Sequence, residues 1–205
     1  MKITNPALFS RKEDINLIFD IMNKLSIKEL KECTLNSFDK VIIKFSEDEK
    51  KNYTDEQKNK LKGDIFEIFA ELYSLFITSA ITCGFKEYQY NEEDYGVDGW
   101  AKNYAGNNCV VQVKFRANPN DEISYEDLAK TGFDAIFDTD YIDPKKENTI
   151  ILFTNSSGAN DQAIKRINRK IKRLYVVNKE IIEKEVNGNA LFWQNCYEII
   201  QKHFE

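Results

Sequence analysis

The spacing of apolar and polar residues along the chain predicts a regular order of helices and strands. Apolar residues that recur every three to four positions are typical of helices with one buried face. They predict helices over residues 12–32, in two pieces, and over 54–82, 124–137, 160–173 and 191–203. Short alternating or continuous apolar runs predict strands over residues 86–90, 97–103, 109–115, 149–153 and 174–177. Residues 33–53 are mixed, with a short apolar run at 38–45 and a charged loop at 47–51.

The order of these elements predicts an α/β fold. Between residues 54 and 177 it reads helix, three strands, helix, strand, helix, strand. Thr54 with Gln57, and Ser124 with Asp127, have the spacing of capping boxes, which mark the first turns of helices. A chain of 205 residues with 42% apolar content can bury a full hydrophobic core, and one domain is the ordinary outcome at this length.

Two of the predicted strands are joined by a short turn that contains Gly106, which is typical of an antiparallel hairpin. A hairpin symmetric about Gly106 would place Asp98 opposite Lys114, and Gln112 opposite Trp100. Because opposed and diagonal residues share a face, we expect Asp98, Gln112 and Lys114 to project together. The other face of the second strand is apolar, which supports this register: it carries Cys109, Val111, Val113 and Phe115.

A carboxylate, an amide oxygen and an ammonium group at one end of a hairpin suit a divalent cation next to a phosphodiester. Mg²⁺ prefers oxygen ligands and keeps several waters, so one or two carboxylates and a substrate phosphate are sufficient. The bound cation can activate water and stabilise the charge that develops on the phosphorane oxygens. Lys114 would then orient or deprotonate the attacking water, or neutralise the transition state. The simpler alternative is an ordinary ion pair between Asp98 and Lys114.

The predicted helix over residues 54–82 is apolar around most of its circumference, which is typical of a buried helix. One narrow polar stripe remains on it, with helical spacing: Asp64, Glu67, Glu71, Ser74 and Thr78. Buried carboxylates are costly unless they are paired or bound to a cation. Glu67, with Glu71 as a second carboxylate, is therefore a candidate metal ligand beside Asp98. The alternative is a stripe that reaches solvent or meets lysines.

Three segments together resemble the PD-(D/E)XK, or restriction-endonuclease-like, nuclease superfamily. They are Lys-Gly-Asp-Ile-Phe-Glu at residues 62–67, Gly-Val-Asp-Gly at 96–99 and Val-Val-Gln-Val-Lys-Phe at 110–115. The similarity is closest to the branch in which glutamine replaces the second acidic residue, and it covers residues 60–178. Residues 123–155 also contain segments similar to nuclease domains attached to viral and mobile-element helicases.

The resemblance implies roles for individual residues. Asp98, Gln112 and Glu67 would hold Mg²⁺, which Mn²⁺ can replace, and Lys114 would be the catalytic lysine. The chain departs from the family pattern at Gln112, where an acidic residue is usual, and at Val97, where proline is usual. The change at Gln112 leaves one fewer charge on the metal, which raises the importance of Glu67.

The resemblance also implies a fold and a domain division. The expected fold is a restriction-endonuclease-like αβββαβ core, in which helices flank a mixed central sheet. This nuclease domain, with C-terminal helices, would occupy residues 56–205. Residues 1–55 would form an N-terminal helical extension, which the resemblance does not explain.

Six of the nine residues from 165 to 173 are basic. On one helix, an apolar stripe that includes Ile164 and Ile167 would leave these cations on the outer faces. They are candidate ligands of DNA phosphates beside the active site: Lys165, Arg166, Arg169, Lys170, Lys172 and Arg173. The alternative is a solvated helix surface. The net charge of −5 argues mildly against tight non-specific DNA binding, although a local basic face can still bind phosphate.

Composition excludes several other classes of protein. The four cysteines are widely spaced without a C-x-x-C pair, which argues against a zinc site and for reduced thiols. The single histidine, His203, excludes most histidine-based catalysis. No phosphate-binding glycine loop indicates a nucleotide cofactor. Neither a membrane span nor a signal peptide is evident, so we expect a cytoplasmic protein without a membrane partner.

These patterns lead us to expect a metal-dependent DNA endonuclease that hydrolyses phosphodiester bonds, in restriction, phage or mobile-element biology. Two alternatives stay open. One is a catalytically inactive DNA-binding or assembly module of the same fold, and the other is a structure-selective nuclease that acts on junctions or ends. A homodimer is plausible, since a double-strand cut usually needs two active sites.

Overall fold

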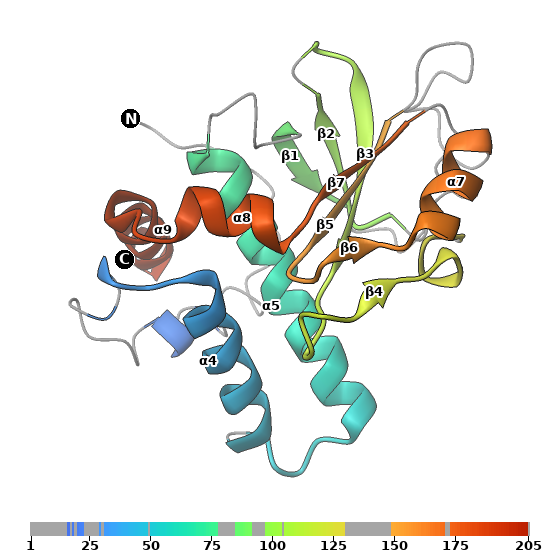
Figure 1. The fold of residues 1–205 in the computed structure, drawn as a ribbon. Coiled ribbons are helices and arrows are strands. Elements are labelled where there is room, and N and C mark those ends of the chain that lie inside the picture. Colours follow the sequence, from blue (N-terminus) through green and yellow to red (C-terminus); the bar gives the residue numbers. More distant parts are fainter. Residues whose placement is uncertain are drawn as a thin grey trace. The chain divides into compact units, whose positions relative to one another are not determined.

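A computed structural model describes most of the chain (Figure 1), which divides into two compact units. The described residues are 16, 18, 20–22, 29, 31–48, 50–77, 85–91, 97–103, 105–129, 149–170 and 173–204. The first unit comprises Met1–Ile77 with Glu183–Glu205, and the second comprises Thr78–Ile182. We refer to them as the helical unit and the sheet unit. The expected division into residues 1–55 and 56–205 follows the extent of the resemblance and stays a prediction.

The helical unit is built from α4 (Leu35–Asp48), α5 (Asp55–Phe76) and α9 (Ala190–Phe204). Another helix, α8 (Lys179–Val186), crosses the boundary between the units. Aromatic rings from the three helices form the core of the helical unit, with ring centroids 5.0–6.0 Å apart: Phe38, Phe66, Phe69, Phe192 and Trp193. Such ring pairs contribute about 0.5–1.5 kcal/mol each beyond the area that they bury.

The sequence predicted the beginning of α5 correctly. Thr54 is the N-cap, its side chain accepts a hydrogen bond from the amide of Gln57, and the Gln57 side chain returns one to the Thr54 amide. The helix ends at Phe76 rather than at residue 82. For α4, the sequence showed a short apolar run without predicting a helix. Residues 47 and 48 of the predicted loop are helical, whereas residues 50 and 51 lie outside the helix. Its apolar residues recur at helical spacing and are buried: Leu35, Phe38, Ile42 and Phe45.

The sheet unit contains a mixed five-stranded sheet in the order β1-β2-β3-β5-β7. Its first three strands are antiparallel: β1 (Lys86–Tyr90), β2 (Gly99–Lys102) and β3 (Asn108–Lys114). Two further strands, β5 (Thr149–Thr154) and β7 (Arg173–Val177), run parallel to β3. The expectation of an α/β fold with a mixed sheet and flanking helices is therefore confirmed at this coarse level.

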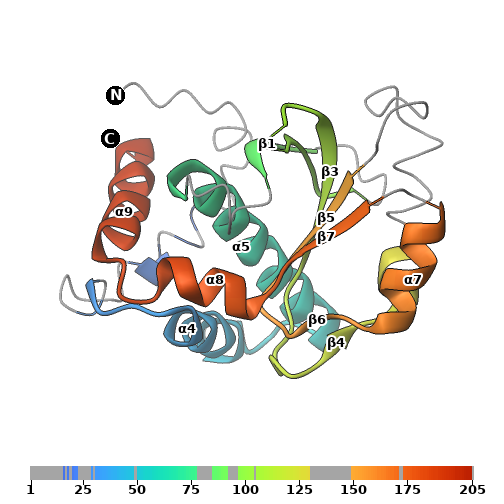
Figure 2. The same ribbon diagram turned by 45° about the horizontal axis from the view of Figure 1, so that its top comes forward.

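Smaller elements complete the sheet unit. The two-residue strands β4 (Glu122–Ile123) and β6 (Gly158–Ala159) pair in parallel and were not predicted. Residues 125–129 are helical, as expected, and residues 130–148 lie outside the described ranges. The next helix, α7 (Asp161–Lys170), lies beside β4 and β6 in both views (Figures 1 and 2). The helices predicted over residues 12–32 fall mostly outside the described residues.

Both faces of β3 and β5, the two central strands of the sheet that pair with each other, are buried. One face packs against α7 through an apolar cluster that contains Val110, Ile150, Leu152 and Ile167. The strand positions between these, Val111, Val113, Ile151 and Phe153, are also buried. Parallel strands covered on both faces read as nearly continuous apolar runs, as β5 does with its sequence Thr-Ile-Ile-Leu-Phe-Thr.

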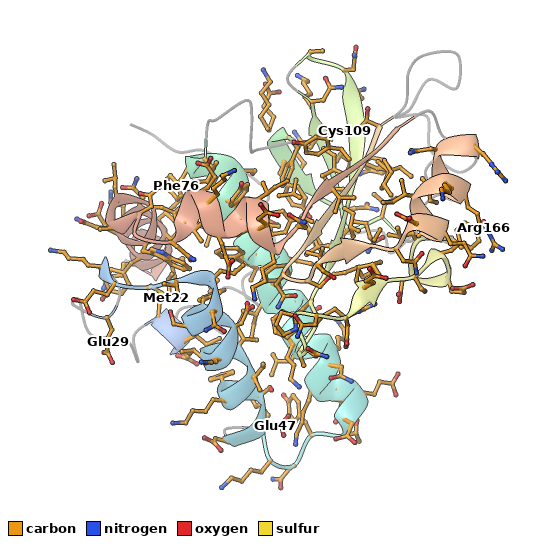
Figure 3. All side chains as sticks on the ribbon, viewed as in Figure 1. Met22, Glu29, Glu47, Phe76, Cys109 and Arg166 are labelled. Carbon is orange, nitrogen blue, oxygen red and sulfur yellow. The ribbon has the colours of Figure 1, made fainter. Side chains whose placement is uncertain are left out.

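An ion-pair network joins α4 to α5 in the helical unit. Glu47, near the end of α4, accepts hydrogen bonds from Lys58 at 2.9 Å and from Lys62 at 3.3 Å (Figure 3 labels Glu47). The bonds from Lys58 first, and from Lys62 second, lower the pKa of the Glu47 carboxyl below its ordinary value of 4.5. Lys62 is buried, so its ammonium depends on this carboxylate for much of its stabilisation.

We expect Glu47→Gln to lower the melting temperature at neutral pH, and this difference to shrink in acid. A carboxyl group whose pKa is lowered on folding stabilises the folded state at pH values above the pKa that the group has in the unfolded chain. That stabilisation is lost as the pH falls through the lower folded pKa. Thermal melts of both proteins between about pH 7 and pH 3 measure the difference. The control is Glu32→Gln, an exposed carboxylate in the same unit, which should cost little at any pH. A pH-independent difference between wild type and Glu47→Gln would contradict the role of the network.

Candidate functional site

The hairpin of β2 and β3 has a different register from the one predicted. Gly99 pairs with Val111 and Lys102 with Asn108, so the continuing register places Asp98 opposite Gln112, not opposite Lys114. Hydrogen bonds within the turn between the strands determine this pairing. Asn103 and Asn107 exchange bonds across the turn, and Gly106 adopts a φ of 81° and donates its amide to Asn103. The pairing shifts by two positions, which preserves the face of every side chain.

The Asp98 carboxylate lies directly against β3. Its Oδ2 accepts hydrogen bonds from the side-chain amide of Gln112 and from the backbone amide of Val113, the latter at 2.7 Å. The backbone amide of Asp98 donates to the carbonyl of Val111 at 3.2 Å. Pairing between β2 and β3 begins at Gly99, so the amide of Val113 has no backbone partner on β2 and donates to the Asp98 carboxylate instead. Asp98 and Gln112 thus meet, as expected, although through a different register.

The face that carries this pair is not a solvent-exposed polar face. Gln112 is only 2% exposed, and Asp98 and Lys114 are half-buried. The same face of β3 also carries Val110, which belongs to the cluster against α7. The expectation of a polar face was therefore wrong, whereas the opposite face of β3 is apolar and buried, as expected. Alternation in β3 places Gln112 on the opposite face from Cys109 and Val111, and both faces of the strand are buried.

Lys114 lies at the end of β3, where it is paired with Thr154 of β5. Within the part of the chain that the structure describes, its ammonium forms no ion pair. The alternative interpretation, an ordinary ion pair between Asp98 and Lys114, is therefore not what the described residues show. Gln112, rather than Lys114, is the side chain that contacts the Asp98 carboxylate.

The chain segments that follow β3 and β5 are held together by Asn155, which sequence reasoning missed. Its side-chain oxygen accepts the backbone amide of Arg116 at 2.7 Å, and its side-chain nitrogen donates to the Arg116 carbonyl at 2.9 Å. Asn155 is 1% exposed, so these two bonds satisfy a buried amide group. They also fix the backbone two residues beyond Lys114. The available signal was a polar run, Thr154-Asn155-Ser156, directly after an apolar strand.

Arg116 itself reaches the short helix over residues 125–129. Its guanidinium forms an ion pair with Asp127 at 2.9 Å, and Asp127 also accepts the amide of Ser124, its capping-box partner. Partial burial raises the pKa of Asp127. The Ser124 amide and the Arg116 guanidinium together outweigh that effect, so the pKa lies below its ordinary value. A cation close to Lys114 is therefore held by a carboxylate that stays ionised at neutral pH.

The polar stripe on α5 belongs to the helical unit. Asp64 pairs with Lys60 at 2.9 Å, as the alternative interpretation of the stripe expects. Glu67 is half-buried and Glu71 is fully buried. Asp98 belongs to the sheet unit, so a metal site shared by Asp98 with Glu67 or Glu71 stays a prediction.

The predicted basic helix is shorter than expected. It ends at Lys170, and Arg173 begins β7, so the basic residues from 165 to 173 do not share one helix. Lys165, Arg166 and Arg169 are exposed on α7, and Figure 3 shows Arg166 projecting outward from it. The Arg166 guanidinium lies 4.9 Å from the centre of the Tyr125 ring. The side chains of Lys170, Lys172 and Arg173 fall outside the described residues.

Two further observations concern partners. In the described ranges, no three His, Cys, Asp or Glu side chains form a metal-binding group. The Asp98–Gln112 pair offers one carboxylate and one amide. None of the described helices combines the length and the apolar character that a membrane crossing requires. Comparisons with models of protein families, with curated proteins and with solved structures find no match for this chain.

Proposed function

We propose that this protein is a metal-dependent nuclease of the PD-(D/E)XK type, with Asp98, Gln112 and Lys114 as its central residues. The observation that carries the proposal is the contact of Gln112 with the Asp98 carboxylate, while Lys114 follows two residues later on the same strand. The site combines a buried amide and a half-buried carboxylate with a lysine that has no carboxylate partner among the described residues. Packing of the sheet alone does not explain why these polar groups lie together.

The topology of the sheet unit supports this proposal. Three antiparallel strands are followed by a helical segment and a strand parallel to the third, which is compatible with the strand and helix order of the superfamily core. Asp98 precedes the second strand, and Gln112 and Lys114 lie on the third. Fold alone does not establish function, so the argument rests on the residues of the site.

The donor atoms at this site fit a hard divalent cation. Asp98 supplies carboxylate oxygens, and Gln112 can present its amide oxygen instead of its nitrogen by rotating the terminal amide. These two residues, with Glu67 as a further candidate, would hold Mg²⁺ or Mn²⁺. A bound cation would supply Lewis acidity toward a phosphate and lower the pKa of water. Asp98 and Gln112 carry one negative charge together, so substrate phosphate and water would complete the ligand set.

Lys114 is assigned the electrostatic role in this mechanism. Its ammonium is half-buried, and no described carboxylate neutralises it. It can therefore donate hydrogen bonds to a phosphate oxygen or orient an attacking water. The bonds of Asn155 to the Arg116 backbone fix the strand end from which Lys114 projects. A fixed cation is more effective than a mobile one, because it needs no reorganisation during the reaction.

The proposed substrate is DNA, and the exposed cations of α7 support a phosphate-binding surface in the same unit. Lys165 and Arg169 are exposed and lie one helical turn apart. We expect the double variant Lys165→Glu with Arg169→Glu to weaken DNA binding for all sequences. Each duplex phosphate contact contributes a slope of about −0.9 to the dependence of log affinity on log salt, so the slope should become shallower by about two units. Fluorescence anisotropy with labelled duplexes over a range of salt concentrations measures both effects.

The matched control is Lys40→Glu with Lys44→Glu. These exposed lysines have the same spacing on α4, so the double variant changes the net charge equally. It should weaken binding only slightly and leave the slope unchanged. If both double variants weaken binding equally, net charge and not the surface of α7 would control affinity.

The proposed activity is tested by incubating the full chain with supercoiled plasmid and Mg²⁺, with EDTA as the control. Nicked or linear product that requires the metal supports a nuclease. Binding without cleavage would favour the second candidate, a catalytically inactive DNA-binding module. That candidate is supported by the hydrogen bond from Gln112 to Asp98, which stabilises the carboxylate without a cation. Branched and linear substrates then distinguish a structure-selective nuclease from a general endonuclease.

A further inference from the structure

The edge strand β1 contains a bulge directly beside the candidate site. Lys86 pairs with Lys102 and Gln89 pairs with Trp100, so Glu87 and Tyr88 together face the single residue Ala101. Glu87 adopts a φ of 55°, the only positive φ among the described residues other than glycine. A β-bulge changes the direction in which a side chain points, and bulges are common next to active sites. Here the redirected side chain is that of Tyr88.

Tyr88 lies against the backbone of Gly99. A Cβ atom at Gly99 would lie 2.4 Å from Cζ of the Tyr88 ring and 2.6 Å from its hydroxyl oxygen. Glycine is therefore required next to Asp98, because any side chain would displace the phenol. The Tyr88 ring also contacts the Phe85 ring, which in turn contacts Phe153 of β5. Tyr88 is 2% exposed, so packing against its neighbours fixes the position of its ring.

The hydroxyl of Tyr88 reaches the residue that carries the proposed chemistry. It donates a hydrogen bond to the backbone carbonyl of Asp98 at 3.0 Å, and the amide of Asn91 donates to the same carbonyl at 3.1 Å. The Asp98 amide donates to Val111 on the opposite side. Asp98 precedes the first residue of β2, Gly99. Its backbone is therefore held by these individual hydrogen bonds and not by regular strand pairing. They determine where its carboxylate meets β3.

We propose that Tyr88 is a positioning residue, which acts through the Asp98 backbone to place the Asp98 carboxylate against Gln112 and Val113. The proposal deepens the function proposed above and rests on it only for the consequence for metal binding. The bulge at Glu87 and the absence of a side chain at Gly99 are the two features that let the phenol reach Asp98. Partners that orient a metal ligand typically change metal affinity or activity by about 10–100-fold when they are removed.

The test is the variant Tyr88→Phe, which removes the hydroxyl and keeps the ring. Tyr53→Phe, the same change at an exposed tyrosine of the helical unit, is the control. The first measurement is the NMR signal of the Val113 amide, because that amide donates directly to Asp98 and reports the position of the carboxylate without any metal. The second is the affinity for Mn²⁺, with the melting temperature measured in parallel.

We expect Tyr88→Phe to shift the Val113 amide signal and increase its hydrogen exchange, and to weaken Mn²⁺ binding about tenfold. The maximal cleavage rate should recover at high Mg²⁺, which a general loss of folding would not allow. An unchanged Val113 signal in Tyr88→Phe would overturn the proposal, whatever the activity. If the signal shifts but the wild-type protein neither binds Mn²⁺ nor cleaves DNA, Tyr88 positions Asp98 and the proposed nuclease function is the part that fails.

Discussion

Lys114→Ala and Asp98→Asn are each expected to reduce Mg²⁺-dependent plasmid cleavage by at least about 100-fold, a typical contribution of one group that transfers or orients a proton. Asp98→Asn removes the only charge of the Asp98–Gln112 pair while keeping an oxygen that can accept the Val113 amide. Lys114→Ala removes an ammonium that has no ion-pair partner in the described part of the chain. Both side chains are half-buried, so the fold should persist.

The controls are Lys102→Ala and Asp121→Asn, which make the same chemical changes at other positions of the sheet unit. Lys102 pairs with Glu87 at 2.7 Å on the surface of the sheet, and Asp121 lies exposed in a loop. Both variants should cleave at nearly the wild-type rate. Wild-type cleavage by either Lys114→Ala or Asp98→Asn, with melting temperatures unchanged, would remove that residue from the proposed mechanism.

Gln112→Glu is expected to have opposite effects without and with metal. Without metal, a second carboxylate would lie against Asp98 at a position that is 2% exposed, and the hydrogen bond from the Gln112 amide would be lost. Two carboxylates in contact cannot both ionise at low cost, so we expect a loss of about 2 kcal/mol or more in the free energy of unfolding. With Mn²⁺, the added charge should increase metal affinity by about tenfold or more.

Chemical denaturation in EDTA and in Mn²⁺ separates these two effects. Gln89→Glu, the same change at an exposed position of β1, should change neither stability nor metal affinity appreciably. If Gln112→Glu loses stability equally with and without Mn²⁺, the site does not bind a cation between these two side chains. Asp98 and Gln112 would then form a structural pair that closes the end of the hairpin.

The sequence by itself determined which residues share a strand face. Side chains alternate with a period of two, so Asp98 and Gln112 share a face in any register that differs by an even number of residues. Their predicted pairing was wrong by two positions, yet their contact occurs. The cap of α5 was likewise predictable, because a capping box involves only residues three positions apart. These local relations do not depend on distant parts of the chain.

Other features depended on local competition that the pattern left open. The apolar spacing of α4 was present in the sequence, but the run was too short to distinguish from a strand by its period. The basic run from 165 to 173 is divided between α7, which ends at Lys170, and β7, which begins at Arg173. Pairing of β7 with β5 provides hydrogen bonds for Arg173 that compete with those of a longer helix.

Only the tertiary structure decided the surroundings of the candidate site. Gln112 is buried because its face of the sheet is covered by an apolar cluster that joins Leu152 of β5, its strand partner, to Ile167 of α7. The contact of Tyr88 with Gly99 and the Asp98 carbonyl requires a bulge, which no local pattern in β1 indicates. Asn155 reaches Arg116 because the ends of parallel strands meet at one edge of the sheet. Local spacing therefore predicted which side chains come together, while long-range pairing determined how they are buried, held and oriented.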